Sequence, residues 1–285
     1  MSVRTSRRWC IERGMPGYPY ELEDLPDPPE RLYGFGDPHL LGAGLAVVGS
    51  RKATPYGLAC ARRFAGWAAS QSIPVVSGAA IGCDLESHRA ALAAEGPTVA
   101  VLPCGADVDY PRRAAATLEL LRVHGTVVSE SPWGAEPKRW SFVKRNRLIA
   151  ALSLAVLVVE AGLPSGTFTT ADHALALGRD VFAVPGSIFA PECLGSNRLI
   201  RQGALPITDI AELAQALGRE AAVSAPPRCA DGILAALVAS PMRPDDIARE
   251  FDLDIVQTVR VLGALETSHS IVRYPDGRYG ASHSR

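Results

Sequence analysis

The feature that most constrains the fold is an alternation of segment types that begins at Gly44. Short runs rich in Val alternate with Ala-rich segments of helical period, and several runs are apolar throughout, as expected for strands buried on both faces of a sheet. Strands are predicted at 44–50, 74–79, 98–103, 125–130, 154–161 and 180–186, with helices near 55–71, 82–95, 112–123, 143–152 and 167–178. This alternation predicts an α/β fold with a doubly wound, mostly parallel sheet.

The rest of the chain divides around this α/β domain, which is predicted to span 44–217 and to close with a helix at 209–218. Residues 1–43 contain few periodic patterns, and their stretch 18–38 is rich in Pro and acidic residues, which predicts an extended lead-in that wraps the domain. Residues 218–228 predict a linker. In 229–285, three helical patterns precede a segment with Asp-Gly between alternating residues, which is a hairpin signal. Three helices and a hairpin predict a small winged-helix domain.

Charge, hydropathy and cysteine usage exclude several classes of protein. The formal net charge is −1, from 29 basic and 30 acidic residues, so overall charge cannot attract a polyanion. No apolar run reaches the ~20 residues that span a bilayer. The basic start lacks the apolar core of a signal peptide. The six cysteines form no CxxC pair, which argues against a zinc site and indicates reduced thiols in a cytoplasmic protein.

One segment has a strong local excess of positive charge. Residues 138–147 (KRWSFVKRNR) hold five basic residues, two aromatic residues and no acid. Cations that meet phosphates and rings that stack on bases suit a single strand of nucleic acid. A solvated helix face is an equally good interpretation of this run alone. Trp133, Trp140 and Phe142 could stack on bases, although aromatic residues near a sheet edge more often belong to the core. Phe142 is the best stacking candidate because it lies within the run.

Four turns at the carboxyl ends of the predicted strands carry small and hydroxylated residues. In open α/β sheets, ligands bind at this edge, and helix N-termini there offer free N–H groups to anions. Each turn alone is consistent with an ordinary connection, but four together beside a basic helix predict an anion-binding edge. The turns contain Gly49, Ser50, Arg51 and Lys52; Ser77 and Gly78; Ser165, Gly166 and Thr167; and Gly195 and Asn197.

Enzyme motifs are absent from the sequence. It contains no GxGxxG, no GxxxxGK[ST], no HExxH and no GxSxG. Asp84 and His88 lie four residues apart on one predicted helix, where a buried hydrogen-bonded pair is favoured over a catalytic one. Glu160 ends an apolar strand, and a catalytic carboxylate and a cap for the following loop are equally consistent with it. We therefore expect no catalytic residue, cofactor or metal.

Taken in order, these segments resemble the family of the DNA-processing protein DprA, also called Smf. The resemblance runs from about Tyr18 to Ile210, and the ordered set is highly specific where each string alone is weak. It is carried by VVGSRKATPYG, SGAAIGCDLESHRAAL, GADVDYP, SESPWG, FVKRNRLIAALS, VVEAGLPSGTFTTADHAL, GRDVFAVPG and GSNRLIRQGA.

The resemblance implies an extended Rossmann fold that binds single-stranded DNA as a homodimer and hands the strand to the RecA recombinase, without nucleotide hydrolysis and without a membrane. It places the strand at Gly49, Ser50 and Arg51, at Arg145 and Asn146 with Phe142 nearby, at Ser165, Gly166 and Thr167, and at the GSN of 195–197. The basic run adds Lys144 and Arg147 to the expected site.

The chain departs from the family pattern in a few places. Many members begin with a helical domain, for which no room is expected before Tyr18, and Cys83, Leu85 and Ser87 replace more usual residues. Two other functions remain as alternatives. A nucleotide hydrolase of the lysine-decarboxylase-like group would need a PGGxGTxxE motif, where 163–173 has LPSGTFTTADH. A nucleotide-binding sensor would need a closed pocket and no basic run.

Overall fold

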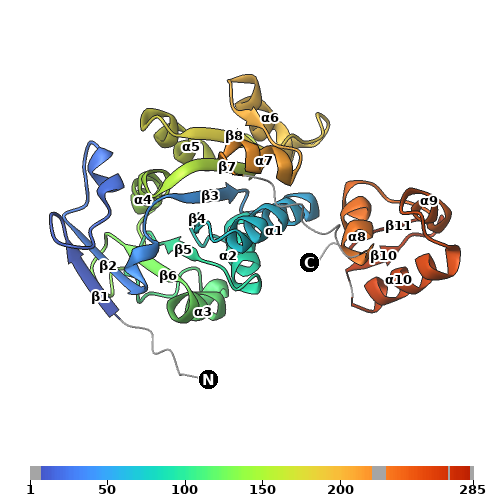
Figure 1. The fold of residues 1–285 in the computed structure, drawn as a ribbon, viewed down its shortest axis with the longest axis horizontal. Coiled ribbons are helices and arrows are strands. Elements are labelled where there is room, and N and C mark those ends of the chain that lie inside the picture. The colour runs from blue at the N-terminus through green and yellow to red at the C-terminus, as the bar shows by residue number, and fades with distance from the viewer. Residues whose placement is uncertain (1–7, 220–228, 269, 283–285) are drawn as a thin grey trace.

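The computed structural model describes residues 8–219, 229–268 and 270–282, and within them nine strands form one sheet (Figure 1). The strands lie in the order β1-β2-β6-β5-β4-β3-β7-β8-β9, and those from β6 to β9 are parallel. Their bounds are β1 Arg8–Glu12, β2 Arg31–Gly36, β3 Gly44–Gly49, β4 Val75–Ser77, β5 Thr98–Val101, β6 Thr126–Ser129, β7 Ser153–Glu160, β8 Asp180–Ala183 and β9 Leu205–Pro206. The predicted doubly wound, mostly parallel α/β class is confirmed.

Helices cover both faces of the sheet, because the apolar strand residues alternate between two buried sides. Val48, Val76 and Val158 pack toward α4, α5 and α6, whereas Leu45, Val47 and Leu157 face the side covered by α1 and α7. Helices α2 and α3 complete this second side over β5 and β6. The helices are α1 Pro55–Ser70, α2 Cys83–Ala93, α3 Ala115–His124, α4 Arg139–Ala151, α5 Thr167–Ala176, α6 Leu194–Arg201 and α7 Ile210–Ala216.

The N-terminal segment differs from the predicted lead-in, because it adds two strands to the sheet. Strand β2 pairs antiparallel with β6, with Tyr33 opposite Ser129, and β1 pairs antiparallel with β2. Between them, a 3-10 helix at Tyr20–Asp24 buries Leu22 in the same core as α4. The segment therefore extends the sheet past β6 and places Tyr33 beside the carboxyl end of that strand.

The C-terminal elements pack around a core of their own. Ile233, Leu237, Ile247, Leu262 and Ile271 form this core. The elements are α8 Cys229–Ala239, α9 Pro244–Glu250, α10 Ile255–Thr267, β10 Ile271–Arg273 and β11 Tyr279–Ala281. Strands β10 and β11 form an antiparallel hairpin. Three helices followed by a hairpin match the predicted winged helix. Of the predicted linker at 218–228, residues 220–228 lie outside the described residues.

Two local signals determine where α1 and α2 begin, next to the carboxyl edge of the sheet. Thr54 caps α1, since its hydroxyl accepts a hydrogen bond from the Gly57 N–H at 3.2 Å, and Pro55 follows as the first helical residue. Gly82 precedes α2 with a φ of +97°, a conformation that a side chain would strain. In the described part of the chain, no helix has the length and apolar character that crossing a bilayer requires.

Candidate nucleic-acid interface

The turn after β3 is the most open of the predicted anion sites. A Cβ on Gly49 would come within 2.7 Å of the Cys83 sulfur, so only glycine fits there. The Ser50 N–H donates to the carbonyl oxygen of Glu160 at 2.8 Å, and the Ser50 hydroxyl oxygen accepts from the N–H of Lys52 at 3.1 Å. These contacts fix the turn and leave Arg51 and Lys52 exposed at its tip.

Arg51 lies over an aromatic ring from the basic helix α4. Its guanidinium carbon is 5.1 Å from the centroid of the Phe142 ring, and the Tyr110 ring meets Phe142 edge-on at 5.6 Å. Tyr110 is 38% exposed, so the aromatic pair borders solvent. No salt bridge joins Arg51 to an acid among the described residues. A guanidinium and two rings therefore meet at one accessible point of the ligand edge.

Asp84 is not the partner of Arg51 but part of a buried support. It accepts a hydrogen bond from the N–H of Gly78 at 3.2 Å, and burial raises the pKa of its carboxyl while the nearby Arg145 opposes that rise. Arg51 and Asp84 form no salt bridge with each other in the described residues.

Arg145, a residue of α4, points into the protein and links the ends of β4 and β5. It is 4% exposed, and its Nη1 donates to the carbonyl oxygens of Gly78, at 2.7 Å, and Val101. Burial lowers its pKa to about 10, an effect that Asp84 opposes. The guanidinium remains charged at neutral pH, but its hydrogen bonds go to these two backbone carbonyl oxygens and, from Nε at 3.1 Å, to the Asn146 Oδ1. Arg145 thus shapes the edge of the sheet from inside, whereas the cations exposed after β3 are Arg51 and Lys52.

The residues predicted after β4 are also part of the support. Ser77 is fully buried and its hydroxyl donates to the Val47 carbonyl oxygen at 2.7 Å. Gly78 is buried against Arg145, whose Nη1 would lie 2.5 Å from a Cβ at this position. Both residues therefore hold neighbouring strands together, and neither presents a side chain to the surface.

The start of α5 lies beside α4, as predicted. Asn146 donates from Nδ2 to the Thr169 hydroxyl at 2.6 Å and reaches the Gly166 carbonyl oxygen at 3.4 Å. Ser165 is partly exposed, and its hydroxyl accepts from the Thr167 N–H at 3.2 Å. Gly166 is exposed and Thr167 is buried. Asn146 therefore orients a turn that offers Ser165 and Gly166 to solvent.

The turn before α6 is tied to the loop after β8. Gly195 donates its N–H to the Ala161 carbonyl oxygen at 2.7 Å. The Asn197 Oδ1 accepts a hydrogen bond from the Gly186 N–H at 3.1 Å, and the Asn197 Nδ2 donates to the Gly186 carbonyl oxygen at 3.0 Å. Both predicted residues lie at the same edge as Arg51, and their polar groups are engaged in holding loops.

Lys144 and Arg147 do not join Arg51. They lie on the other side of α4, where Lys144 Nζ is 3.1 Å and Arg147 Nη2 is 2.6 Å from Glu130 Oε2. Arg147 is only 5% exposed. Residues three apart on a helix share a face, which explains why these two cations point together and away from Phe142.

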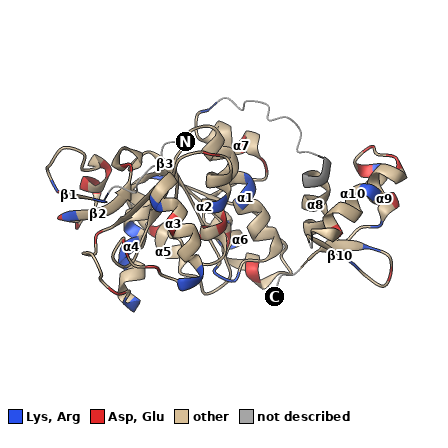
Figure 2. Ribbon diagram, turned by 90° about the horizontal axis from the view of Figure 1, so that it is seen from below, with Lys and Arg blue, Asp and Glu red and all other residues tan. Residues whose placement is uncertain are grey.

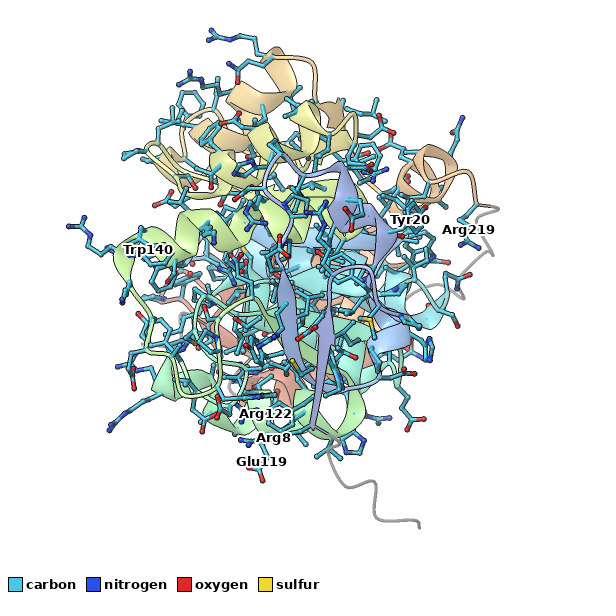
Figure 3. All side chains as sticks on the ribbon, turned by 90° about the vertical axis from the view of Figure 1, so that its left-hand side faces the viewer. Arg8, Tyr20, Glu119, Arg122, Trp140 and Arg219 are labelled. Carbon is cyan, nitrogen blue, oxygen red and sulfur yellow. The ribbon has the colours of Figure 1, made fainter. Side chains whose placement is uncertain are left out.

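The basic run is therefore split between several tasks. Figure 2 shows Lys and Arg gathered along α4, but only Lys138 and Arg139 at its start are exposed without an ion pair in the described chain. Trp140 projects at the outer end of the helix in Figure 3 and is 60% exposed. Trp133 instead packs edge-on against Tyr33 and Phe35. Phe142 remains the aromatic residue nearest to Arg51.

The candidate catalytic groups serve the fold. Glu160 is buried and accepts hydrogen bonds from Thr54, from its N–H at 3.0 Å and from its hydroxyl, and burial raises the pKa of the carboxyl. His88 forms its hydrogen bond with Thr98, at 2.8 Å, rather than with Asp84. Burial lowers the pKa of His88 to about 3, so the ring is neutral. Glu160 therefore holds the segment between β3 and α1 rather than the loop that follows it in the sequence, which was the predicted cap. The predicted Asp84–His88 hydrogen bond is not formed.

Three residues that matter here were not among the predicted site residues. Tyr110 belongs to the GADVDYP segment, and its aromatic side chain after a buried strand was the available signal. Asp84 was considered only as a partner of His88, and Glu130 was visible only as an acid at the end of a predicted strand. Their roles depend on which cations reach them from α4, and that is set by the tertiary fold.

Comparison with known proteins shows the family to which the chain belongs. A model of the family described as DNA recombination-mediator protein A matches residues 9–218, and a DprA winged helix domain model matches residues 217–277. The chain belongs to the DprA family. The first match covers the sheet and its helices up to α7, and the second covers α8 to β10. The winged-helix class of the C-terminal elements is thereby confirmed.

Several curated DprA relatives are similar in sequence. A DNA processing protein DprA of Mycobacterium tuberculosis is 46% identical over 173 residues, which are 61% of this chain and 44% of the relative. Protein Smf of Escherichia coli is 42% identical over 70% of this chain and 54% of its own length. DprA of Bacillus subtilis is 39% identical over 67% and 65%. The chain thus spans about half the length of the curated relatives it matches.

Two solved DprA structures share the fold. DprA of Streptococcus pneumoniae has a TM-score of 0.69 and 35% identity, with 73% of each chain covered. DNA processing protein A of Helicobacter pylori, studied for its single-stranded DNA binding mode, has a TM-score of 0.68 and 30% identity, with 74% of this chain and 95% of that chain covered.

Proposed function

We propose that this protein binds single-stranded DNA along the carboxyl edge of its sheet and loads a RecA-class recombinase onto the strand, in natural transformation or recombination. The observation that carries the proposal is the exposed guanidinium of Arg51, seated over Phe142 with Tyr110 at the ring edge. Family membership and the single-stranded DNA studied with the Helicobacter pylori relative support the same class of ligand.

The chemistry of this point suits a single strand. An Arg guanidinium can hold two phosphate oxygens with a planar pair of N–H donors. Every base has a π-face, so stacking on Phe142 or Tyr110 tolerates any sequence. A duplex conceals those faces between its base pairs. Arg51 and the two rings therefore favour an unpaired strand over a duplex.

Binding rather than catalysis fits the carboxylates of this edge. Glu160 is engaged by both the N–H and the hydroxyl of Thr54, and Asp84 is held by Gly78 beside Arg145. A nucleotide hydrolase would need one of these groups free to reach a substrate or a water. We therefore propose a non-enzymatic role for the site.

The test is titration of the purified protein with a labelled single strand and with a duplex of the same sequence, at two salt concentrations. We expect tighter binding to the single strand and a steep loss of affinity with salt, because each neutralised phosphate contributes about 0.7 to the log–log slope. Equal affinity for the duplex, or no effect of salt, would contradict the proposal.

The assembly and the partner belong to the proposal as well. From family membership we infer a homodimer formed through the α/β part of the chain. Light scattering at micromolar protein is expected to give twice the mass of the chain. A monomer that binds the strand with full affinity would remove the dimer from the proposal. Recombinase loading is tested by whether the protein speeds RecA assembly on a strand already covered by a single-strand-binding protein.

A further inference from the structure

The outer side of α10 in the winged helix is apolar. Ile255, Val256 and Val259 are all exposed there, while Leu262 on the inner side belongs to the core of the same domain. A helix at the surface normally turns polar residues to solvent, and β-branched residues gain little from an exposed helical position. Clustered apolar side chains on a protein surface mark places where another surface binds. The outer side of α10 therefore has the character of a contact surface.

The border of this surface is acidic. Asp252 and Asp254 precede α10, both are exposed, and neither forms a salt bridge in the described part of the chain. The Asp254 carboxylate accepts a hydrogen bond from the Gln257 N–H at 2.8 Å, which fixes it at the start of the helix. Acids here repel a phosphate backbone. They favour instead a protein surface whose apolar residues are bordered by cations.

The start of α4 exposes a surface of that kind. Trp140 projects at the outer end of the helix (Figure 3) and is 60% exposed. Val143 is also exposed, and residues three apart share one face of a helix. The Lys138 Nζ lies 5.9 Å from the centroid of the Trp140 ring. Tryptophan is strongly enriched among the residues that dominate binding at protein interfaces, so this face is suited to a protein partner.

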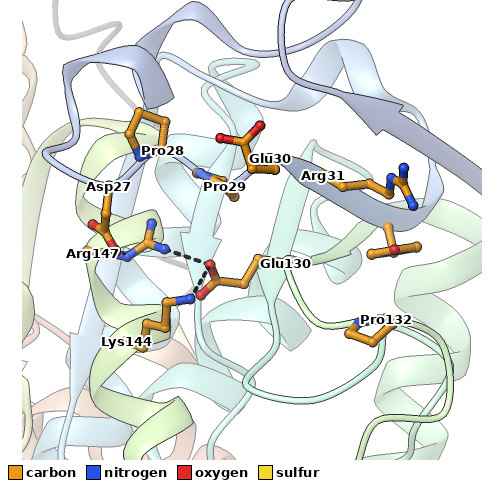
Figure 4. A pocket seen from close by; sticks show the side chains of 10 residues that line it. Asp27, Pro28, Pro29, Glu30, Arg31, Glu130, Pro132, Lys144 and Arg147 are labelled. Atoms are coloured by element: carbon orange, nitrogen blue, oxygen red, sulfur yellow. Dashed lines mark hydrogen bonds and ion pairs between the residues drawn. The ribbon is translucent and has the colours of Figure 1, made fainter.

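The cations at the start of α4 are available to such a partner. Farther along the helix, Lys144 and Arg147 are both engaged by Glu130 (Figure 4). By contrast, Lys138 and Arg139 are exposed and form no salt bridge among the residues that the structure describes. The positive charge of this face is therefore not neutralised by the protein itself.

The surfaces of α4 and α10 complement each other in charge and in order. Segment 136–143 contains two cations and one acid, and segment 252–259 contains two acids and no cation. In both, the charges stand at the start of a helix and the exposed apolar residues follow within one turn. Two helices laid side by side with their starts together would bring cations to acids and Trp140 to Val256 and Val259.

Within one chain, the two surfaces belong to different sides of the molecule. Helix α8 of the winged helix contacts α1, and α1 and α4 cover opposite faces of the sheet (Figure 1). A second copy of the chain supplies both surfaces in equal amount. In a two-fold pair, each winged helix can dock on α4 of the other copy, so that both contacts form at once.

We propose that the winged helix is an assembly module whose outer α10 surface docks on Trp140 of a second copy of this chain. The contact assigns the exposed Trp140 ring to a protein partner rather than to a base. It adds a contact of its own to the homodimer inferred through the α/β part. It lies apart from Arg51 and does not depend on the proposed function.

The test is carbodiimide crosslinking of the full chain, which joins a carboxylate to an amine, with loss of water, where the two groups touch. An equal mixture of isotope-labelled and unlabelled protein is incubated to equilibrium, crosslinked and analysed by mass spectrometry. We expect Lys138 to be linked to Asp252 or Asp254, with labelled peptides joined to unlabelled ones. Links confined to peptides of the same label would place the contact within one chain and overturn the proposal, as would the absence of these links.

Two variants and their mixture locate the contact. Trp140→Ala and Val259→Asn should each reduce the crosslink by about tenfold, the effect of removing a central contact residue. Leu175→Ala is the control, because Leu175 on α5 is also 60% exposed, and it should keep the crosslink. An equal mixture of the two impaired proteins should restore the link, because one retains an intact α10 and the other an intact α4. Restoration also shows that both variants are folded.

A mixture that stays uncrosslinked, or an undiminished crosslink in either single variant, would overturn the pairing of these two surfaces. Single-strand binding is measured on the same samples. Protein that binds the strand but forms no crosslink would keep the proposed function and lose this contact. Protein that crosslinks as expected but binds no strand would keep the contact and lose the proposed function.

Discussion

The carboxyl edge of the sheet and the winged helix differ in the kind of side chain that they expose to solvent. At the edge, Arg51 is exposed and lies over Phe142. In the winged helix, α10 occupies the place of a reading helix, yet Val256 is 64% and Val259 55% exposed. Around α9, acidic and basic residues alternate (Figure 2). A fold used for DNA reading therefore need not supply the DNA site, which depends on the side chains it carries.

The largest expected effect concerns the buried support of the edge. Arg145→Met leaves Asp84 without its cation and should lower the free energy of unfolding by about 3–5 kcal/mol. Arg139→Met, at an exposed position of the same helix, should change it by less than about 0.5 kcal/mol. Urea unfolding followed by tryptophan fluorescence measures both. Equal stability of the two variants would contradict the account, because it would show that Arg145 does not stabilise the buried part of the edge.

The aromatic pair gives the next effect. Phe142→Ala should weaken single-strand binding by about 1–3 kcal/mol, because a base loses its stacking surface. Trp140→Ala removes a larger but outward-pointing ring from the same helix and should change affinity by less than about twofold. Fluorescence anisotropy with a labelled strand distinguishes them. If Trp140→Ala cost more than Phe142→Ala, the strand would run over the outer end of α4 instead of past Arg51.

Lowering the pH should reduce the free energy of unfolding of the α/β part through His88. The pKa of His88 is held near 3 by burial and by Arg145, against about 6.5 in an unfolded chain, so below pH 6.5 the unfolded state binds a proton that the folded state does not. Between about pH 7 and pH 5, this group alone should lower stability by about 2 kcal/mol. The raised pKa values of Asp84 and Glu160 act in the opposite direction.

The His88→Gln variant isolates that contribution. Its unfolding free energy should approach that of the unaltered protein as pH falls, because the variant has no imidazole to protonate. All four tryptophans precede residue 141, so tryptophan fluorescence reports on the α/β part and not on the winged helix. Parallel pH profiles for the two proteins would show that His88 is not the titrating group.

Removal of the winged helix should have the smallest effect. A chain that ends at residue 225 should keep its single-strand affinity within about threefold, since residues 228–285 carry seven basic and eight acidic residues and contribute little attraction to phosphate. Tryptophan fluorescence checks that the shortened chain is folded. Loss of most affinity in a folded product would make the winged helix a primary DNA site.

Much of the α/β architecture could be predicted because each strand from β3 to β8 is an apolar run whose residues are buried on both sides. Strands β1 and β2 were missed because their residues sit among Pro and acids, and because β2 is stabilised by pairing with β6, almost a hundred residues later. Local pattern cannot show such a distant pairing.

The placement of candidate site residues could be predicted where position along a strand decides it. Gly49, Ser50 and Arg51 follow directly from the end of β3. Lys144 and Arg147 were assigned to the strand because they share a basic run with Phe142, and the structure turns them toward Glu130 instead. Charge along a sequence does not show which side of a helix faces which partner.

The most direct test of the central claim compares two exposed arginines, one from each region. Arg51→Ala and Arg260→Ala each remove one cation with no ion pair in the described chain, the first from the sheet edge and the second from α10. Single-strand affinity is measured for both across a range of salt concentrations, with melting temperatures as controls. Arg51→Ala should bind about ten- to a hundredfold more weakly, with a salt slope reduced by about 0.7 and an unchanged melting temperature. Arg260→Ala should match the unaltered protein. Wild-type affinity and slope in Arg51→Ala, or a loss confined to Arg260→Ala, would contradict the assignment of the strand to the sheet edge.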